Sequence, residues 1–461
     1  MNTSSISIFS LLFSLILLIV SFIVYQKITK PQLIPVYEDT WWGPAKNNHQ
    51  IIDKSIKPFK ILFTDNEKND LKNRLKNTRD LIAPLEGTAW TYGISGTFLK
   101  NTIIKYWLND YDFEKRINKL NEFPQYKTNI QGLNIHFIHI KSTNNEKGKK
   151  IVPLLMLHGW PGSITEFQKI IPILNKLKNN ENIIFEIIAP SLPGFGFSDG
   201  AVRPGLGSPQ IAVVLKNLML KLGFDKFYVH GGDWGAIISA QMSSLFPNNV
   251  LGMHSSMCTA SSLKNTFKTL LYSLAPSYWL DEDYALQMKP IMEQIKDRWI
   301  GTGYLHAQAT YPDTVGVGPS DSPASLAAII LEKFSFGTNR LNKFKDDGGL
   351  LEKFTMDELL DNVMIYWIPN SMTTAMRIYA ESLNSQTNSL TIMWPVEVPS
   401  ACIQFPDEII YQPSEFLKER FINLIQITRM PTGGHFSSLE EPEIVANDIL
   451  NFIIKVEKLK K

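Results

Sequence analysis

The sequence predicts an α/β fold built on a mainly parallel sheet, and three observations support this expectation. Apolar, strand-like runs alternate with helix-like segments through the middle of the chain, as in a parallel sheet with crossover helices. Residues 263–386 lack clear strands and are rich in aromatic and Met residues, so we expect a helical insert there. Strand-like runs resume after the insert. With 461 residues, 44% of them hydrophobic, the chain can build a large core and accessory segments.

The individual elements are expected at the following places. A connector, Pro31–Pro44, contains Trp41 and Trp42, which suit either a membrane interface or packing on the body. An amphipathic helix is expected over Asp65–Arg79. Strands are expected at Ile135–Ile140, Val152–Leu157, Ile183–Ile188, Phe227–His230, Val396–Gln404 and Leu424–Thr428. Helices are expected at Val213–Leu222 and Ala236–Phe246, and from about Glu441 onward.

The N-terminus carries 20 residues without a charge, Ile6–Tyr25, which is enough to span a bilayer. A cleaved signal peptide is the competing interpretation, but it would need a basic start, a shorter apolar centre and a small-residue cleavage site. The first charged residues, Lys27 and Lys30, follow the apolar run. The positive-inside bias therefore predicts a single-pass anchor with the rest of the chain in the cytosol.

Charge and cysteine content exclude several classes of partner. Lys and Arg number 46 against 44 Asp and Glu, and the net charge of +2 gives no reason to expect nucleic acid or another polyanion. Cys258 and Cys402 lie far apart in the sequence and not in a metal-ligand spacing. We expect neither a disulfide nor a structural zinc, and so few thiols agree with a reducing compartment.

The most informative motif is His230-Gly231-Gly232-Asp233-Trp234-Gly235, which joins a strand-like run to a helix-like run. Glycines flank Asp233 because only small residues fit such a sharp strand-turn-helix bend. A carboxylate at this bend can attack a saturated carbon and form an ester, which activated water can cleave, whereas an alcohol would form an ether that water cannot readily cleave. The alternative is a turn without a catalytic role.

A second loop, His158-Gly159-Trp160-Pro161-Gly162, follows the expected strand Val152–Leu157. Hydrolases with a nucleophile at a strand-turn-helix bend build their oxyanion hole from the amide after the nucleophile and one amide from this earlier loop. The backbone N–H groups of Trp234 and Trp160 are therefore the candidates. An ordinary turn at the end of a strand is the alternative.

The candidate base is His435, in the glycine-supported loop Gly433-Gly434-His435-Phe436 after the last expected strand. The chain order in such hydrolases is nucleophile, acid, histidine. The acid is therefore expected after Val396–Gln404, where Asp407 and Glu408 stand side by side. Only one of these two side chains can face His435 from a simple loop.

These motifs belong to a longer series, through which the chain resembles the microsomal epoxide hydrolase family, including the insect juvenile hormone epoxide hydrolases. The series is Trp42-Gly43-Pro44, Phe123-Pro124-Gln125 through Gln131-Gly132-Leu133, His158 to Gly162, Ser191 to Ser198, Gly231 to Gly235, Pro312 to Gly316, Asp321-Ser322-Pro323 and Gly433 to Phe436. The resemblance implies an α/β-hydrolase fold. It also implies a membrane anchor at 1–30, an N-terminal epoxide-hydrolase extension at 31–130, a core at 131–262 and 387–461, and a helical lid at 263–386.

The resemblance further implies which acidic residue supports the histidine. In the family, the acid follows a Phe-Pro pair and one further residue, which corresponds to Glu408 in this chain. Family members often carry an aromatic residue where this chain has Asp407, and that departure keeps Asp407 as a rival.

Two lid tyrosines of the family donate hydrogen bonds to the epoxide oxygen, and they correspond to Tyr304 and Tyr379. Both lie inside the expected insert. Without the surrounding motifs, Tyr311 or Tyr366 would be equally eligible, because tyrosine is common in cores and on surfaces.

The implied function is the addition of water to an apolar epoxide, giving a vicinal diol through an ester on Asp233. Substrates would be terpenoid epoxides like juvenile hormone, or xenobiotic arene and alkene oxides. The protein would be located in the endoplasmic reticulum membrane. No cofactor and no metal is expected, since Gly194-x-Gly196 lacks the third glycine and the strand-to-helix context of a dinucleotide loop. Two alternatives are a haloalkane dehalogenase, against which the two lid tyrosines argue, and a non-catalytic, membrane-tethered binder of apolar ligands.

Overall fold

The computed structural model describes residues 34–45, 53, 55–142, 149–176, 183–385, 388 and 391–460. The expected anchor, Ile6–Tyr25, lies outside these residues. Within the described ranges, no helix combines the length and the apolar character that crossing a membrane requires.

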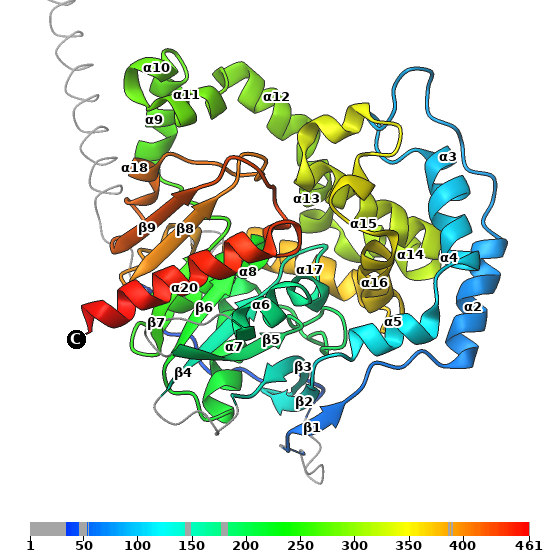
Figure 1. Cartoon of the computed structure of the whole chain (residues 1–461), viewed down its shortest axis with the longest axis horizontal. Coiled ribbons are helices and arrows are strands. Elements are labelled where there is room, and N and C mark those ends of the chain that lie inside the picture. The colour runs from blue at the N-terminus through cyan, green and yellow to red at the C-terminus, as the bar shows by residue number, and fades with distance from the viewer. Residues whose placement is uncertain are drawn as a thin grey trace, which may run out of the picture.

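A nine-stranded sheet runs through the described part of the molecule (Figure 1), in the order β1-β2-β3-β5-β4-β6-β7-β8-β9. The six strands from β5 to β9 in this order are parallel, and β1, β2 and β3 extend one edge in antiparallel pairs. The sheet is therefore mainly parallel, as the alternating sequence pattern predicted. The strands are β1 Lys57–Phe59, β2 Gln125–Ile130, β3 Leu133–Ile140, β4 Lys150–Leu157, β5 Ile183–Pro190, β6 Phe227–Gly231, β7 Val250–Ser255, β8 Ser400–Gln404 and β9 Leu424–Arg429.

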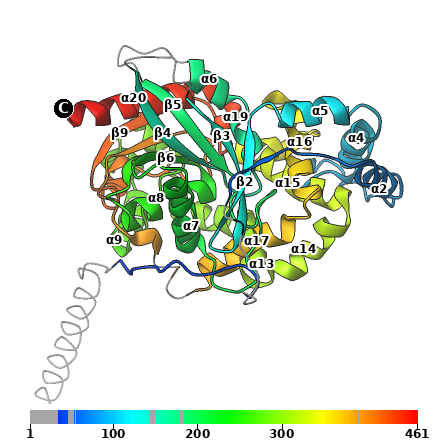
Figure 2. The same ribbon diagram turned by 90° about the horizontal axis from the view of Figure 1, so that it is seen from below.

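Helices cover both faces of the sheet, with α6 and α20 on one face and α7 and α8 on the other (Figure 2). Between β7 and β8 the described chain forms α9 to α17 and short 3-10 turns, without a strand. The helices are α2 Asp65–Lys76, α3 Gly96–Phe98, α4 Lys105–Asn109, α5 Phe113–Leu120, α6 Ile170–Lys176, α7 Ser208–Lys221, α8 Asp233–Leu245, α9 Leu263–Tyr272, α10 Pro276–Trp279, α11 Glu282–Gln287, α12 Ile291–Gly301, α13 Gly303–Thr310, α14 Pro312–Asp321, α15 Pro323–Thr338, α16 Met356–Trp367, α17 Met372–Leu383, α18 Ser414–Leu417, α19 Ser437–Glu440 and α20 Pro442–Leu459. Shorter turns are the π-helix Leu99–Ile104 and the 3-10 helices Ile164–Phe167, Arg340–Phe344, Leu350–Glu352 and Thr391–Met393.

One expected strand differs clearly from the structure. The run Val396–Gln404 forms a strand only from Ser400 onward, and Val396 makes an isolated bridge with Phe421. The reason is Pro399, which interrupts the run and has no N–H to donate to a neighbouring strand. The prediction was therefore wrong for the first half of this run.

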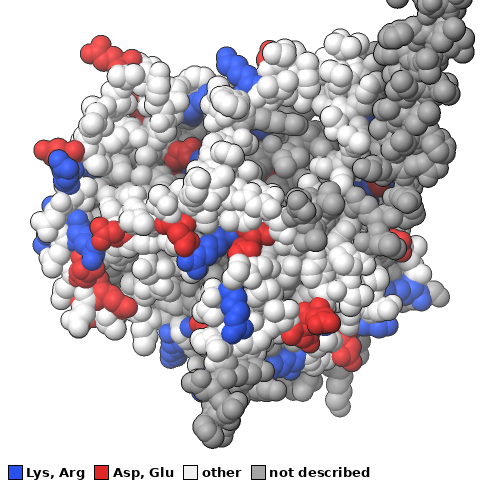
Figure 3. Space-filling model, turned by 180° about the vertical axis from the view of Figure 1, so that it is seen from behind, with Lys and Arg blue, Asp and Glu red and all other residues white. Residues whose placement is uncertain are grey.

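The N-terminal segment packs on the rest of the protein. Helices α2, α4 and α5 lie beside α14, α15 and α16 in both views, although these groups are far apart in the chain (Figure 1 and Figure 2). Trp42 is buried, and its backbone N–H donates to the Gln131 carbonyl oxygen at 2.8 Å, so this tryptophan packs on the body. Among the described residues on the face shown in Figure 3, Lys, Arg, Asp and Glu are interspersed and form no extended region of one charge.

The expectation of no disulfide was wrong, because Cys258 and Cys402 are bonded to each other. They are 144 residues apart in sequence, but β7 and β8 are neighbouring parallel strands, and Ser255 pairs with Cys402. The chain beyond β7 brings Cys258 back over β8, so that the two Cα atoms lie 5.9 Å apart. Sequence distance was a poor guide because parallel neighbours are joined by a long connection.

Candidate active site

Asp233 occupies a strained turn between β6 and α8. Its φ is +49°, in the left-handed region that residues other than glycine rarely adopt. Such a conformation costs on the order of 1–3 kcal/mol and persists only where the surrounding structure enforces it. The flanking glycines are required sterically, because a Cβ at Gly231 would overlap the Gly235 carbonyl and one at Gly235 would overlap the Leu157 carbonyl. The turn therefore holds the Asp233 carboxylate at the carboxyl edge of the sheet.

The loop after β4 meets this turn, because β4 and β6 are parallel neighbours and Leu157 pairs with Gly231. The Trp160 N–H donates to Asp233 Oδ1 at 2.7 Å. Gly159 permits this approach, since a Cβ there would overlap the Asp233 side chain. Trp234, the residue after Asp233, lies in the first turn of α8. Both residues proposed for the oxyanion hole therefore adjoin Asp233, one through a direct hydrogen bond.

His435 lies between two carboxylates. Its Nδ1 is 2.6 Å from Glu408 Oε1, and its Nε2 is 3.4 Å from Asp233 Oδ2. Burial lowers the pKa of His435, but Glu408 and Asp233 outweigh that effect and raise the pKa well above its ordinary value. The imidazole of His435 thus connects the carboxylates of Asp233 and Glu408.

Of the two adjacent acidic residues, Glu408 is the one that faces His435. The neighbouring Asp407 instead accepts a hydrogen bond from the Asn339 side chain at 3.0 Å. Burial raises the pKa of Asp407, whereas Glu408 accepts a further hydrogen bond from the Ile409 N–H at 2.7 Å.

Tyr304 on α13 and Tyr379 on α17 face the same site from the helices between β7 and β8. The Tyr304 ring stacks on Trp160 at a centroid distance of 5.4 Å, and the Tyr379 ring packs edge-on against Trp234 at 4.9 Å. The two tyrosine rings are 6.1 Å apart. Burial raises the pKa of both hydroxyls, which keeps them protonated and able to donate hydrogen bonds.

The other eligible tyrosines lie elsewhere. Tyr311 is 72% exposed. Tyr366 is buried, but its hydroxyl donates to the Gly162 carbonyl oxygen at 2.6 Å. Neither therefore shares the position of the Tyr304 and Tyr379 pair.

Sequence reasoning missed two buried carboxyl groups next to these residues. Burial raises the pKa of Glu440 to about 8, and this side chain accepts hydrogen bonds from the N–H groups of Gly434 and Phe436, on either side of His435. Burial also raises the pKa of Glu166 to about 8, and its carboxyl packs against Gly162 in the loop after β4. In the sequence, Glu440 and Glu166 are marked only by standing a few positions after a glycine motif. Acidic residues at such positions are too common for this to indicate a role.

No group of three His, Cys, Asp or Glu side chains within the described ranges is arranged to hold a metal ion. The chemistry available at the site is that of a carboxylate, an imidazole with its carboxylate partner, and two phenols. A carboxylate beside two hydroxyl donors suits a substrate in which the attacked carbon is bonded to a leaving oxygen. The carboxylate can attack the carbon while the hydroxyls hydrogen-bond and protonate the departing oxygen.

Comparison with known proteins agrees with this geometry. Residues 56–167 match the model of the epoxide hydrolase N terminus, and residues 152–290 match that of the alpha/beta hydrolase fold. Juvenile hormone epoxide hydrolase 2 of Ctenocephalides felis is 47% identical over 94% of this chain and 92% of its own length. Epoxide hydrolase 1 of Oryctolagus cuniculus is 41% identical over 95% of this chain and 98% of its own. The chain belongs to the microsomal-type epoxide hydrolase family.

The fold of this epoxide hydrolase is shared with a solved relative. The crystal structure of juvenile hormone epoxide hydrolase from the silkworm Bombyx mori superposes with a TM-score of 0.88 and 45% sequence identity. The match covers 92% of this chain and 99% of that one. The α/β-hydrolase fold with its mostly parallel sheet, expected from the sequence, is confirmed.

Proposed function

We propose that this epoxide hydrolase forms its diol in two steps at Asp233. In the first step, Asp233 Oδ2 attacks one epoxide carbon, the carbon–oxygen bond of the ring breaks, and Tyr304 and Tyr379 hydrogen-bond the departing oxygen and supply its proton. The product is an ester that joins the substrate to the enzyme. The observation that carries this proposal is the position of Asp233, between the Trp160 N–H at 2.7 Å and His435 Nε2 at 3.4 Å.

In the second step, His435 takes a proton from water, and the hydroxide oxygen attacks the carbonyl carbon of the ester. The Trp160 and Trp234 N–H groups stabilise the negative charge on Oδ1. The ester bond to the substrate then breaks, and the diol leaves with a proton returned from His435. Asp233 retains one oxygen from water, and the second water proton leaves its new carboxyl group and restores the tyrosine hydroxyl that was deprotonated in the first step. Glu408 orients the imidazole and stabilises its protonated form.

Esterification also prepares the histidine for its role. Asp233 is one of the two carboxylates that raise the pKa of His435, and its charge disappears when the ester forms. The pKa of His435 therefore falls at the point where a neutral imidazole is needed as a base.

Isotope labelling tests the covalent route directly. In a single turnover in H₂¹⁸O, we expect the label in Asp233 and not in the diol, because the diol oxygen comes from the carboxylate. Mass spectrometry of the diol and of the peptide that contains Asp233 measures both. Label in the diol during the first turnover would overturn the covalent route.

Two other functions remain distinguishable by assay. A haloalkane dehalogenase would release halide from alkyl halides, and it would need N–H donors for the halide where this site presents the Tyr304 and Tyr379 hydroxyls. A non-catalytic binder of apolar ligands would form no diol. Halide release together with absent epoxide hydrolysis would replace the proposed function.

For the substrate, we propose an apolar epoxide. The relatives include proteins named juvenile hormone epoxide hydrolases and others named epoxide hydrolase 1, so terpenoid epoxides and arene or alkene oxides are both candidates. The ratio kcat/KM across epoxides of graded size, with a juvenile hormone among them, ranks these classes.

We further propose the division of the chain into an anchor at 1–30, an N-terminal extension at 31–130, a core at 131–262 and 387–461, and a lid at 263–386. The position of Tyr304 and Tyr379 supports a lid, because both reach the site from that segment. The anchor would hold the protein in the endoplasmic reticulum membrane as a single-pass chain, with its body on the cytosolic side after Lys27 and Lys30.

The disulfide between Cys258 and Cys402 counts against that orientation, because such bonds persist mainly in oxidising compartments. Protease protection of intact microsomes tests the side directly. Digestion of the body without detergent supports the cytosolic side, and protection until detergent is added overturns it.

The surface of the protein supports contact with lipid. Exposed large hydrophobic side chains gather in α9 to α12 and the turns between them, which form one outer edge of the molecule (Figure 1). They are Leu263, Phe267, Leu270, Leu271, Leu274, Tyr278, Trp279, Leu286, Met292, Ile295, Trp299 and Ile300. An exposed apolar surface of this extent marks an interaction site, and Trp and Tyr suit the boundary between lipid and water.

A further inference from the structure

Helix α16 holds the loop that carries the Trp160 amide through two side-chain hydrogen bonds. The Asn362 side-chain amide donates to the Pro161 carbonyl oxygen at 2.8 Å, and the Tyr366 hydroxyl donates to the Gly162 carbonyl oxygen at 2.6 Å. Both side chains are 1% exposed. These two carbonyls directly follow Trp160, so the helix fixes the peptide units next to the amide that binds Asp233.

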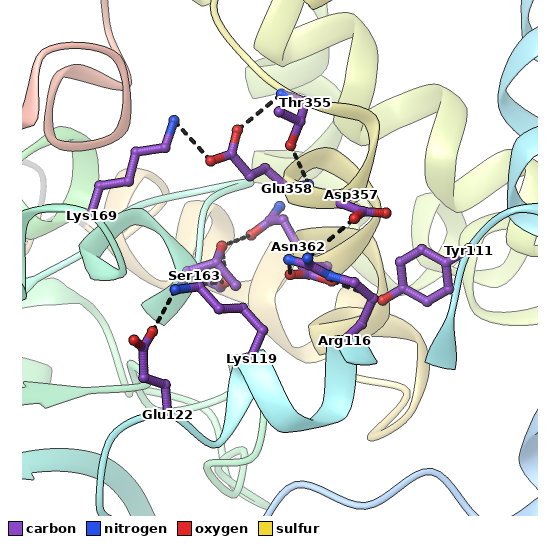
Figure 4. Close-up of polar contacts among 12 residues, drawn as sticks. Tyr111, Arg116, Lys119, Glu122, Ser163, Lys169, Thr355, Asp357, Glu358 and Asn362 are labelled. Carbon is purple, nitrogen blue, oxygen red and sulfur yellow. Dashed lines mark hydrogen bonds and ion pairs between the residues drawn. The ribbon is translucent and has the colours of Figure 1, made fainter. Parts of the chain in front are cut away.

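The orientation of Asn362 is itself fixed. Its amide oxygen accepts a hydrogen bond from the Thr165 hydroxyl at 3.1 Å, and the Thr165 and Ser163 hydroxyls are 3.0 Å apart (Figure 4). With its oxygen occupied in this way, Asn362 presents its NH₂ group to Pro161. The amide thus bridges two points of the same loop.

The same helix is held on another side by the N-terminal segment. Asp361, next to Asn362 in the sequence, is fully buried, and its carboxylate accepts hydrogen bonds from Arg116 Nε at 3.0 Å and Nη2 at 2.5 Å. The Tyr111 hydroxyl donates to the same carboxylate at 2.9 Å, and Arg116 Nη1 reaches Asp357 at 3.2 Å (Figure 4). A two-pronged contact between a guanidinium and a carboxylate fixes geometry more strictly than a single hydrogen bond does.

A buried ion pair of this kind is weak evidence for stability, because removing two charges from water offsets much of their attraction. What the Arg116 pair does supply is a defined position for α16. An apolar contact could hold the helix against the extension but would permit it to slide or rotate. The neighbouring Asn362 would then lose its alignment with the loop.

We propose that the N-terminal extension positions the oxyanion hole through α16. Arg116 and Tyr111 fix Asp361, and Asn362 and Tyr366 on the same helix fix the loop that presents the Trp160 N–H. All of them act as positioning residues, since none touches the reacting atoms. This inference rests on the proposed two-step route, and it gives the extension a part in the chemistry.

The two steps depend differently on this positioning. In the resting enzyme, the Trp160 N–H stabilises the Asp233 carboxylate, whose negative charge is lost during alkylation. During ester hydrolysis, negative charge develops on Oδ1, and the donor must already be in place. A displaced Trp160 N–H should therefore slow ester hydrolysis and leave alkylation nearly unchanged.

The test uses Tyr366→Phe and Asn362→Asp in the full-length protein, with alkylation and ester decay measured separately by rapid quench and intact-protein mass spectrometry. We expect ester decay to slow by about 10- to 100-fold, less than the 10² to 10³ lost when an oxyanion-hole donor is removed outright. Alkylation should stay within about threefold, and the ester should accumulate. Arg116→Lys, which keeps the charge but loses the two-pronged contact, should show the same split with a smaller effect.

A matched control is Tyr228→Phe. This buried hydroxyl donates to Glu457 at 2.6 Å, between β6 and α20, away from the Trp160 loop. It should lower thermal stability without changing the ratio of the two rates, so a general loss of stability cannot produce the expected split. Equal slowing of both steps in the Tyr366 and Arg116 variants, or no change in either, overturns the inference.

His435→Gln separates this inference from the proposed function. That variant should trap the ester whether or not the extension matters, because alkylation does not need the base. If His435→Gln forms no ester, the two-step route itself fails. If it forms the ester but the Tyr366 and Arg116 variants do not accumulate it, only the positioning role fails.

Discussion

The helices between β7 and β8 fall into two parts with opposite surfaces. Helices α9 to α12 leave most of their large apolar side chains exposed, and ion pairs and hydrogen bonds join them to the body, such as Lys268 to Glu419 at 2.8 Å and the Tyr284 hydroxyl to Gln404 at 2.6 Å. Helices α13 to α17 bury most of their apolar side chains in the main core and bring Tyr304 and Tyr379 against Trp160 and Trp234 beside Asp233. The insert therefore has an inner part, α13 to α17, which lines the site, and an outer part, α9 to α12, which faces outward.

The difference shows that burial within the insert cannot be inferred from composition. Both parts are apolar, so hydrophobicity alone does not tell them apart. The inner part is ordered around polar groups that need an exact position, such as Asn362 and Tyr366 against the loop after β4. The polar contacts of the outer part, such as Lys268 with Glu419 and Arg429 with Asp281, hold it to the body and not to the loop after β4, and its exposed apolar side chains suit a partner that needs no fixed geometry, such as lipid.

The largest expected effect comes from neither part but from the carboxylate of Asp233, which the inner part faces. Asp233→Asn removes the proposed nucleophile, and we expect kcat to fall on the order of 10⁴-fold or more. The residual activity of this variant is the reference against which the activities of the insert variants are compared. Activity is measured as diol formation. The mass of the variant protein is checked because deamidation of the new Asn would restore Asp and part of the activity.

Asp407→Asn is the matched control for this change, because Asp407 hydrogen-bonds Asn339 and not His435. It should keep near wild-type turnover. A loss comparable to that of Asp233→Asn would make Asp407 part of the catalytic machinery and displace Glu408 as the partner of His435.

The inner part of the insert is probed by Tyr304→Phe and Tyr379→Phe. Each removes one hydroxyl and leaves the ring packing on Trp160 and Trp234 intact. We expect ring opening to slow by about 10- to 10⁴-fold if each hydroxyl assists the departing oxygen. Single-turnover alkylation measures this step, and ester decay should stay unchanged. Slowing confined to ester decay would contradict the assignment and weaken the contrast between the two parts.

The site was more predictable from sequence than the insert around it. Asp233, Trp160 and His435 could be located because a strand, a sharp glycine turn and a helix impose a local spacing. Strands β1, β2 and β7 were not predicted, and the Gly132 turn between β2 and β3 passed unnoticed. Strand β1 pairs with β2 and β7 pairs with β8, in each case across a long stretch of sequence, whereas β2 pairs with its neighbour β3 across a two-residue turn.

Contacts between distant segments were the part that sequence could not supply. The disulfide joins residues brought together by two parallel neighbours, and Arg116 meets Asp361 only because α5 packs on α16. Neither pair leaves a periodic or spaced signal in one sequence. The division of the insert into an inner and an outer part could not be predicted either, because both parts look apolar and helical in the sequence.

A smaller effect is expected from pH. In the free enzyme, Glu408 and Asp233 together raise the pKa of His435 despite its burial, whereas in the ester only Glu408 keeps its charge. Ester decay requires neutral imidazole, so its rate should rise with pH and level off above the pKa of His435 in the ester. That midpoint should lie below the midpoint of His435 titration in the free enzyme, measured by NMR. Equal midpoints would show that Asp233 contributes little to the pKa.

The smallest effect on chemistry is expected from the outer part of the insert. Replacing Phe267, Leu274 and Ile295 by Ser keeps every tryptophan and should leave kcat for a water-soluble epoxide within about twofold, because these exposed side chains belong to the outer part and surface changes usually act weakly. In liposomes, the variant should lose part of the tryptophan quenching by brominated lipids that the wild type shows. The control replaces Leu62, Ile82 and Val202, which are exposed and apolar but lie outside α9 to α12. Equal quenching in all three proteins would mean that lipid does not contact the outer part, and a large fall in kcat would mean that the insert is not divided as its surfaces indicate.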